Sequence, residues 1–437
     1  MLGAFRSALA TPDLRRKILF TLGMVVLYRL GATIPSPGVS YPNVQQCVTQ
    51  LQGQGSQSVY SLLNLFSGGA LLQLSVLSLG IVPYITSSII IQLLQVVIPR
   101  FEQLKKEGQA GQAKLTQYTR YLTIALAILQ ATGVVALAVR GQLFQGCSVP
   151  VVPDDSVLNL IVIVIVMTAG AALLMWMGEL ITERGIGNGM SLLIFTSIAS
   201  RIPGEGGNIL KSHGPLVFTV VLCFAIAIIA TVVFIEQAQR RIPVQYAKRM
   251  IGRRMYGGTS TYLPLKVNQA GVIPVIFGSS LLYLPQLLGQ LAGNQDSAIT
   301  RFIMTYIVSQ SSWVHIVLYM ALIIFFAYFY VSITFNPEER ADDMKKFGGF
   351  IPGIRPGRPT AEYLGFVLSR ITLPGSLYLG VIAILPNFFL SITGGQGGNQ
   401  NFPFGGTAVL IMVNVGLDTV KQIESQLTQR KYEGFLR

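Results

Sequence analysis

Two hydrophobic segments far apart in the chain are interrupted by glycine and proline in the same order. Each has a glycine, then a proline, then an isoleucine at fixed offsets: Gly80, Pro83 and Ile85 in the first, and Gly271, Pro274 and Ile276 in the second. Glycine and proline weaken a helix and free backbone polar groups. Inside a membrane, such groups must be satisfied by protein or by a water-lined cavity. Paired interruptions in two halves of a membrane chain therefore indicate a transport path.

Residues suited to catalysis or metal binding are sparse in this chain. Its two histidines, His213 and His315, are isolated, and its three cysteines have no metal-ligand spacing. No glycine-rich loop ending in Lys-Ser/Thr is present, so any nucleotide energy has to come from a partner. We therefore predict no catalytic residue, no metal and no cofactor. Whether Cys47 and Cys147 pair stays open, because sequence does not give their separation.

Composition places the chain in a membrane. Of its 437 residues, 51% are hydrophobic and 11% charged, against roughly 25% charged in soluble domains. No charged residue or histidine occurs between Leu30 and Pro99. The basic start, at 6–17, precedes an apolar run without a small-residue cleavage site, so we expect no cleavable signal peptide. These features predict a polytopic membrane protein and exclude a soluble enzyme.

Ten apolar segments predict an all-α fold with ten transmembrane helices, most of them near the roughly 20 residues that a bilayer needs. We expect these spans at 18–34, 74–98, 118–139, 157–181, 190–202, 216–235, 270–288, 314–334, 371–389 and 407–420. Lys and Arg crowd both termini and the second-to-third, sixth-to-seventh and eighth-to-ninth loops, whereas the opposite loops hold only Arg140, Arg201, Lys211 and Arg301. Both termini are therefore predicted to be cytoplasmic.

Five spans in each half make the two halves opposite in orientation, so we predict an inverted repeat of 1–205 and 206–437 around a central pore. The fifth spans also match, with Gly189 before Ile194 and Gly406 before Ile411. Equivalent isoleucines then stand at four positions: Ile85, Ile194, Ile276 and Ile411. If they converge, they form an apolar ring that excludes ions by dewetting. The alternative is that they face lipid or neighbouring helices.

A short amphipathic segment precedes the second span. Val59, Leu62, Leu63 and Phe66 fall at helical spacing and are followed by Ser67, Gly68 and Gly69. The segment is too short to cross a bilayer. A re-entrant half-helix in a cavity and an interfacial helix on the membrane surface both fit it.

Three functional classes compete. A passive protein-conducting channel needs no catalytic group, whereas ion-coupled transporters usually carry intramembrane Asp, Glu or His. Only Arg29 lies well inside a span, where it either snorkels to the outer surface or bonds to loop carbonyls. An intramembrane enzyme is disfavoured because intramembrane carboxylate pairs are lacking. The basic loop at 236–267 suits ribosomal RNA phosphates or an acidic partner, with anionic lipid as the competing explanation.

Two long runs resemble signatures of the SecY family, the central subunits of the bacterial protein-conducting channel and relatives of the translocon alpha subunit. They are residues 76–94 and 176–191; residues 263–268 and 351–357 also look like the family. The likeness covers nearly the whole chain. It implies a channel that translocates unfolded secretory proteins across the bacterial cytoplasmic membrane and releases transmembrane segments into lipid through a lateral gate.

The resemblance also implies roles for individual residues. The family's pore ring maps onto Ile81, Ile85, Met190, Ile194, Ile276 and Ile411, with Met190 departing from the usual isoleucine. The plug, at about 58–70, maps onto Tyr60, Leu62, Leu63, Leu65, Phe66, Ser67, Gly68 and Gly69. The polar cluster of the lateral gate maps onto Thr86, Gln130 and Asn268.

The implied partners act from both the membrane and the cytoplasm. They are the SecE and SecG subunits, the SecA motor ATPase, the ribosome, signal sequences and precursor polypeptides, and membrane lipid. The cytoplasmic loops at about 236–267 and 336–370 would dock the ribosome and the motor, through Arg249, Arg253, Arg254 and Arg355. The chain itself is then no enzyme, because SecA or the translating ribosome supplies the energy.

Overall fold

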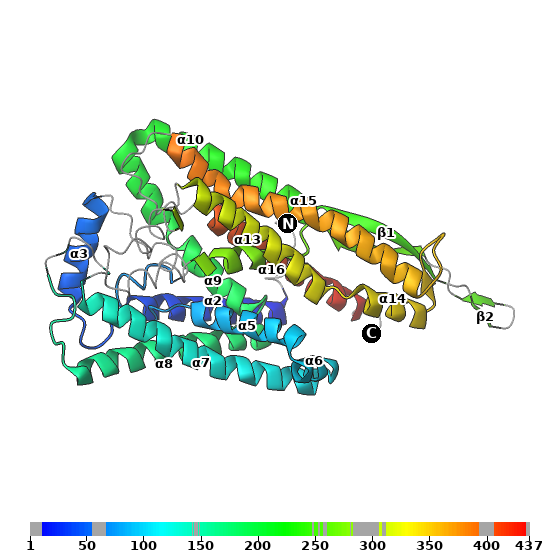
Figure 1. The fold of residues 1–437 in the computed structure, drawn as a ribbon, viewed down its shortest axis with the longest axis horizontal. Helices are drawn as coiled ribbons and strands as arrows, with labels where there is room; N and C mark the ends of the chain where they lie inside the picture. The colour runs from blue at the N-terminus through cyan, green and yellow to red at the C-terminus, as the bar shows by residue number, and fades with distance from the viewer. Residues whose placement is uncertain are drawn as a thin grey trace. The chain divides into compact units, whose positions relative to one another are not determined.

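The computed structural model of the 437-residue chain describes residues 11–54, 67–141, 143, 147, 149–246, 249–251, 254–256, 260–279, 281–282, 306–307, 312–392 and 406–433. Helices dominate this part of the chain (Figure 1). They are α2 (Pro12–Thr33), α3 (Tyr41–Gln54), α5 (Val82–Val97), α6 (Pro99–Lys106), α7 (Gln109–Val139), α8 (Val157–Arg184), α9 (Gly189–Ala199), α10 (Ile202–Gln237), α13 (Trp313–Thr334), α14 (Pro337–Lys346), α15 (Arg358–Ile392) and α16 (Gly406–Glu433).

The membrane-spanning character predicted from composition is present in these helices. Five stretches of the described chain are long and apolar enough to cross a bilayer, and α5 with α6, which are bent by 100°, can make a sixth. Each of the ten expected spans contains described helical residues. The polytopic helical fold is therefore confirmed, although the spans differ from the prediction in length and boundaries.

The second span begins later than expected. Residues 67–81 form a series of turns, and helix α5 starts at Val82 instead of Leu74. Gly80 has φ +59°, a left-handed conformation that ends the turns and that other residues adopt at a cost. Pro83 then lies in the first turn of the helix, where its missing N–H is tolerated.

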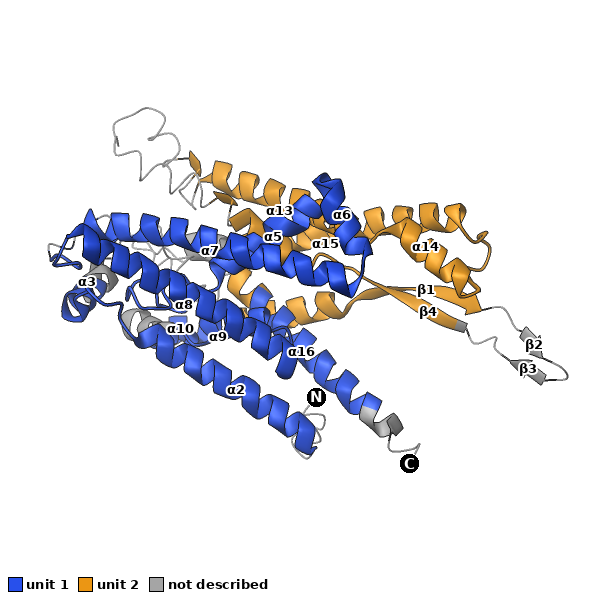
Figure 2. Cartoon of the chain, turned by 90° about the horizontal axis from the view of Figure 1, so that it is seen from below, with its two compact units in different colours: residues 1–222, 392–404, 411–437 blue, residues 223–391, 405–410 orange. Residues whose placement is uncertain are grey.

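The chain forms two compact units (Figure 2). Unit 1 comprises Met1–Leu222, Ile392–Phe404 and Ile411–Arg437, and unit 2 comprises Cys223–Ser391 and Gly405–Leu410. In unit 1, α7 packs against α5 and α8, and α8 packs against α9. Helix α10 is bent at Gly214, where φ is +79° and Pro215 follows. The division at residue 205 into two sequence halves remains a prediction.

Unit 2 contains a small antiparallel sheet that the sequence analysis did not anticipate. Strands β1 (Gln239–Tyr246), β4 (Ser260–Lys266) and β5 (Gly349–Phe350) pair in the order β4-β1-β5. Strands β2 (Arg249–Ile251) and β3 (Arg254–Tyr256) form a separate hairpin between β1 and β4. Because β5 comes from the eighth-to-ninth loop, the sheet joins this loop to the sixth-to-seventh loop.

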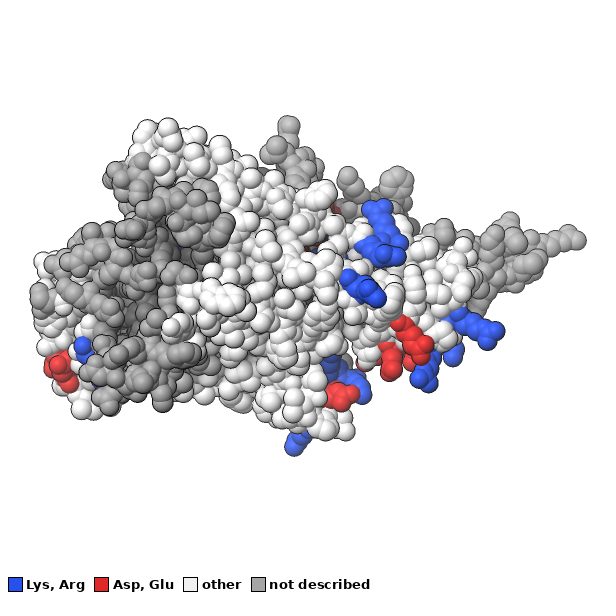
Figure 3. Space-filling view, turned by 45° about the horizontal axis from the view of Figure 1, so that its top comes forward, with Lys and Arg blue, Asp and Glu red and all other residues white. Residues whose placement is uncertain are grey.

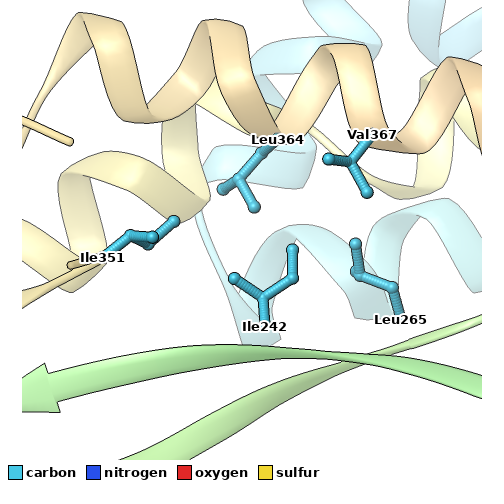
Figure 4. Close-up of a cluster of buried hydrophobic side chains, with 5 residues drawn as sticks. All are labelled: Ile242, Leu265, Ile351, Leu364 and Val367. Atoms are coloured by element: carbon cyan, nitrogen blue, oxygen red, sulfur yellow. The ribbon is translucent and has the colours of Figure 1, made fainter. Parts of the chain in front are cut away.

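A buried cluster fixes this sheet to helix α15. Ile242 and Leu265 from the strands meet Leu364 and Val367 from the helix, and Ile351 closes the cluster from the loop after β5 (Figure 4). All five side chains are buried. Burying aliphatic side chains of this size stabilises by about 1.5–3 kcal/mol each. The cluster therefore holds the sixth-to-seventh and eighth-to-ninth loops as one structural element.

The outer surfaces of the long helices are apolar. On α2, Leu19, Leu22, Val26 and Leu30 recur at helical spacing and are more than half exposed. A soluble domain would not leave such a stripe in water, whereas a helix in contact with lipid requires it. On the face shown in Figure 3, most of the charged side chains lie in the right-hand half of the view, a few lie at the left-hand end, and the described surface between them is uncharged.

The question of the cysteines is settled by a disulfide. Cys47, buried on α3, pairs with Cys147 in the loop before α8, with Cα atoms 5.4 Å apart. This bond ties helix α3 to the segment before α8 in unit 1, across 100 residues of sequence. Cys223, on α10, is free and exposed.

Candidate channel-forming site

The two glycine-proline breaks have the same backbone conformation. Gly80 and Gly271 have φ values of +59° and +61°. A helix begins two residues after each glycine, at Val82 and Ile273. The first hydrogen bonds also match, since Ile85 N–H donates to the Ile81 carbonyl at 3.1 Å and Ile276 N–H donates to the Val272 carbonyl at 3.2 Å. Each break thus presents its isoleucine at the same point of a new helix.

The short fifth and tenth spans also begin alike. Both α9 and α16 start at a glycine whose missing side chain admits a backbone carbonyl of the preceding span. At Gly189 the neighbour is the Gly178 carbonyl on α8, and at Gly406 it is the Ile382 carbonyl on α15. Any larger residue would have to push two helices apart.

A second pair of glycine contacts lies beside the breaks. A side chain at Gly170 on α8 would meet the Val76 carbonyl, and one at Gly375 on α15 would meet the Val267 carbonyl. Val76 and Val267 each precede the glycine of their break by four residues. The repeat predicted from sequence is therefore present in the local packing of both units.

The six predicted pore-ring residues are not exposed. Ile81, Met190, Ile194, Ile276 and Ile411 are buried, and Ile85 is half-buried. Side chains directed toward lipid would be exposed in the isolated chain, as those of α2 are, so the burial argues against a lipid-facing position. Packing against neighbouring helices remains the alternative to a ring. Ile276 belongs to unit 2 and the other five to unit 1. Their convergence in one ring remains a prediction.

A capped turn positions the two residues of α9 that are predicted to belong to the ring. The Asn188 side chain accepts hydrogen bonds from the N–H groups of Met190 and Ser191, at 3.1 and 3.3 Å, and so caps the helix. Gly189 N–H donates to the Thr182 hydroxyl at 2.9 Å, which ties this turn to the end of α8. Met190 then packs into the space left by Gly178. A flexible thioether suits this shallow gap.

The end of the predicted plug is held by polar groups of α2 and α9. Arg29 Nη1 donates to the Gly68 carbonyl at 3.2 Å, so of the two alternatives for this arginine the structure shows the bond to a loop carbonyl. The Tyr28 hydroxyl lies within hydrogen-bond distance of the Ser197 hydroxyl and donates to the Ser67 carbonyl at 3.4 Å. Of the predicted plug residues, the structure describes Ser67, Gly68 and Gly69. The others lie outside the described residues: Tyr60, Leu62, Leu63, Leu65 and Phe66.

Of the residues predicted for the lateral gate, Thr86 and Asn268 make hydrogen bonds to groups other than one another. The Thr86 hydroxyl donates to the Val82 carbonyl of its own helix at 2.9 Å. Asn268 is buried, and its amide donates to Glu236 Oε2 at 3.0 Å and to the Gly271 carbonyl at 3.2 Å. Asn268 therefore satisfies backbone freed by the break. Gln130 lies half-buried on α7. A shared gate cluster remains a prediction.

Arg355 lies in an exposed loop with a firm base. Ile351 anchors the loop in the buried cluster, and the Thr360 hydroxyl donates to the Arg355 carbonyl at 2.8 Å. The Arg355 side chain itself is exposed. Arg249 is the first residue of strand β2 and Arg254 is the first residue of strand β3, and Arg253 lies outside the described residues. A basic group on a rigid base suits an anionic partner.

Two charged contacts were missed by the sequence analysis. Arg120 on α7 and Glu179 on α8 form a bidentate ion pair, with N–O distances of 2.9 and 2.8 Å. The buried carboxylate of Glu236 receives the amide of Asn268. Opposite charges near the same ends of adjacent spans were the available signal for the first pair. No such signal existed for the second pair.

Comparison with known proteins gives a consistent family. The SecY family model matches residues 75–420. The chain is 70% identical over 443 residues to the "Protein translocase subunit SecY" of Mycobacterium tuberculosis H37Rv, with both chains covered completely. It is 63% identical over 443 residues to the protein of the same name from Streptomyces coelicolor, again with full coverage of both.

Solved structures share the fold at low sequence identity. A structure described as a protein-conducting channel aligns with TM-score 0.63 and 19% identity, covering 94% of this chain and 91% of the other. A SecY structure concerned with the plug domain gives TM-score 0.61 and 20% identity at the same coverage. Sec61 from a canine ribosome-channel complex gives TM-score 0.59 and 19% identity, also at that coverage.

Proposed function

The chain belongs to the SecY family of protein translocase subunits, and from this premise we propose how its residues conduct unfolded polypeptide through a membrane. It is a multi-pass membrane protein of the protein-conducting channel class. The observation that carries the mechanism is the repeated break, in which a left-handed glycine starts a new helix bearing Ile85 in one unit and Ile276 in the other. Neither break presents a charged group, so no small ionic substrate is recognised there.

The pore ring seals the resting channel by excluding water. Six aliphatic or thioether side chains make a constriction that small ions cannot cross, because water does not fill it. The same side chains demand no particular hydrogen bond from a passing chain. They therefore yield around polypeptide of any sequence, and the flexible Met190 helps them to do so.

Lateral exit uses the polar contact at Thr86, Gln130 and Asn268. Interhelical hydrogen bonds within a membrane are worth about 0.6 kcal/mol each. A hydrophobic signal sequence replaces them by offering apolar surface to the opened gap. The plug segment, whose end at Ser67–Gly69 is described, closes the outer funnel at rest.

The cytoplasmic sheet is the docking platform. The β2–β3 hairpin and the Arg355 loop rest on one sheet, because β5 pairs with β1. Their basic side chains bind ribosomal RNA phosphates or the acidic surface of a motor, and SecA or the ribosome supplies the energy. The relation to Sec61 from a ribosome-channel complex supports this proposal. SecE and SecG complete the assembly in the bacterial cytoplasmic membrane, with both termini of the chain cytoplasmic.

Reconstitution tests the function as a whole. Liposomes that contain this chain, SecE and SecG should import an unfolded secretory precursor when SecA and ATP are added. Uptake of a small metabolite driven by an ion gradient, without precursor import, would support a transporter instead.

Crosslinking tests the ring. In a Cys223→Ser background, Ile194→Cys and Ile276→Cys should crosslink to a precursor stalled during translocation. Leu193→Cys and Val275→Cys are the matched controls, because Leu193 and Val275 directly precede Ile194 and Ile276 in the sequence and are buried as well. Equal crosslinking at ring and control positions would contradict a ring at these residues.

Charge reversal tests the docking platform. Arg355→Glu should abolish most motor-dependent import while the channel folds normally. Arg358→Glu is the matched control, since this exposed guanidinium already pairs with Glu362 at 3.2 Å. Normal import by the Arg355→Glu variant would remove the residue from the interface.

A further inference from the structure

We propose that Tyr28, Arg29 and Ser197 form a latch that holds the backbone of Ser67 and Gly68, and that Arg29 is its main positioning residue. The inference rests on the proposed function, in which residues at about 58–70 plug the resting channel. It adds the groups that keep one end of this segment in place. All five residues belong to unit 1.

Arg29 is where the latch holds most strongly. A guanidinium inside a transmembrane helix is costly and requires a polar partner. Arg29 is half-buried and its Nη1 donates to the Gly68 carbonyl at 3.2 Å. A hydrogen bond from a charged donor is about twice as strong as a neutral one. The sole charge well inside the first span is thus directed at the end of the plug segment.

Gly68 makes this approach possible. Its φ is +66°, and a side chain there would lie 2.8 Å from Arg29 Nη1 and 3.2 Å from Ser197 Cα. Any other residue would be strained in this conformation and would displace the guanidinium. The glycine therefore permits close contact of the loop backbone with both α2 and α9.

Tyr28 and Ser197 supply a second, weaker contact that can change state. When Ser197 donates to Tyr28, the tyrosine hydroxyl donates to the Ser67 carbonyl at 3.4 Å. When Tyr28 donates to Ser197 instead, the serine hydroxyl donates to the Leu193 carbonyl at 2.9 Å. Both arrangements leave the buried hydroxyls paired. Tyr28 can therefore release Ser67 without leaving an unsatisfied hydroxyl, which a reversible latch requires.

The latch is linked to the pore ring through α9. Ser197 follows the ring residue Ile194 by three residues on that helix, and both are buried. This spacing is about one helical turn, or roughly 5 Å along the axis. A polypeptide that displaces Ile194 moves Ser197 as well, because the helix is stiff over so short a distance. Entry of a substrate thereby weakens the contact at Ser67.

Ion leakage through the resting channel tests the latch. Purified complex in planar bilayers, without motor or precursor, should leak about tenfold more when Arg29→Met removes the charged donor. That change corresponds to about 1.4 kcal/mol of lost closed-state stability. Arg140→Met is the matched control, since Arg140 is an exposed arginine after α7. Arg29→Lys, which keeps one charged donor, should restore most of the seal.

The weaker contact has its own test. Tyr28→Phe and Ser197→Ala should each raise leakage about two- to tenfold. The double variant should leak no more than the stronger single variant, because both changes cut one hydrogen-bond chain. Multiplying effects would mean that the two residues act separately and would contradict the shared chain. These variants keep the buried volume nearly unchanged, so they also decide the case if Arg29→Met fails to fold.

Deletion of residues 60–69 separates the latch from the plug. If the deletion raises leakage and Arg29→Met, Tyr28→Phe and Ser197→Ala do not, the plug assignment stands and the latch is wrong. If the deletion leaves leakage unchanged, the plug assignment fails and the latch fails with it. Precursor import in liposomes is measured alongside, and loss of the seal with retained import is the expected result for the latch variants.

Discussion

Adding one methyl group at Gly189 or Gly406 should separate the effects of helix packing from those of helix propensity. In Gly189→Ala the new Cβ meets the Gly178 carbonyl, and in Gly406→Ala it meets the Ile382 carbonyl. A backbone carbonyl within a helix cannot rotate away as a side chain can. The start of α9 or α16 therefore has to move away from the preceding span.

The expected change in the free energy of unfolding follows from two opposing effects, helix propensity and overpacking. Alanine is favoured over glycine in a helix by up to about 1 kcal/mol. Overpacking of a well-packed contact costs about 1–3 kcal/mol. Each variant should therefore lose about 1–2 kcal/mol of stability, with similar values in the two units because the same contact recurs. Gly416→Ala on α16 meets open space, so it should gain about 0.5–1 kcal/mol.

Thermal unfolding in detergent gives the stability, and resting ion leakage gives the function. Gly189→Ala should also raise leakage, because it shifts Met190 and Ile194 together with the start of α9. Gly416→Ala should leave leakage at the wild-type level. Equal stability of Gly189→Ala, Gly406→Ala and Gly416→Ala would show that the close carbonyl contacts do not limit these positions, and would refute the reasoning.

Three further predictions concern unit stability and covalent structure. Arg120→Met should lower the free energy of unfolding by about 1–3 kcal/mol, measured by thermal unfolding, because it leaves the carboxylate of Glu179 without its bidentate partner. The side chains of Arg120 and Glu179 are 42% and 23% exposed, so the cost lies between those of surface and buried ion pairs. Cys47→Ser should make the chain migrate on a non-reducing gel as the reduced protein does. Ile351→Ala should weaken SecA binding by loosening the base of the Arg355 loop, with a local loss of about 2–4 kcal/mol.

Each of these predictions has a control. The charge swap that exchanges Arg120 and Glu179 should recover most of the lost stability, and failure to do so would mean that the pair is not the source of the effect. Without reductant, maleimide should label only Cys223 in the denatured wild type; labelling of all three cysteines would show that the disulfide is absent. Pro352→Ala, at an exposed neighbour of Ile351, should bind SecA normally.

The sequence was most informative where backbone chemistry is restrictive. Gly80 and Gly271 were matched by their common spacing to a proline and an isoleucine, and in the structure both have positive φ, which few other residues tolerate. Ile194 and Ile411 were singled out by their equal offsets after a glycine, and both are buried; their convergence in a ring remains a prediction. For Arg29, whose charge in a lipid-embedded helix needs a polar environment, the sequence left two alternatives, snorkelling to the outer surface or bonding to loop carbonyls, and the structure shows the second.

Contacts between distant segments were beyond the sequence. The partner of Arg29 could not be identified as Gly68, and the fit of Met190 against Gly178 depends on how α8 and α9 pack. The sheet was not predicted because its alternation is short and lies among basic residues: in β1 only Ile242 and Val244 are buried, each between exposed neighbours. The start of the second span was wrong because apolar turns before Val82 resemble helix in composition.

The bond between Cys47 and Cys147 has a consequence for biosynthesis. Its two cysteines lie 100 residues apart in the sequence. In the proposed topology both reach the oxidising outer side of the membrane, so the first stays reduced until the second has crossed. The disulfide then forms only in chains whose intervening spans have been inserted in the correct order and orientation. A chain inserted with one span missing would place the two thiols on opposite faces of the bilayer and would keep both of them free.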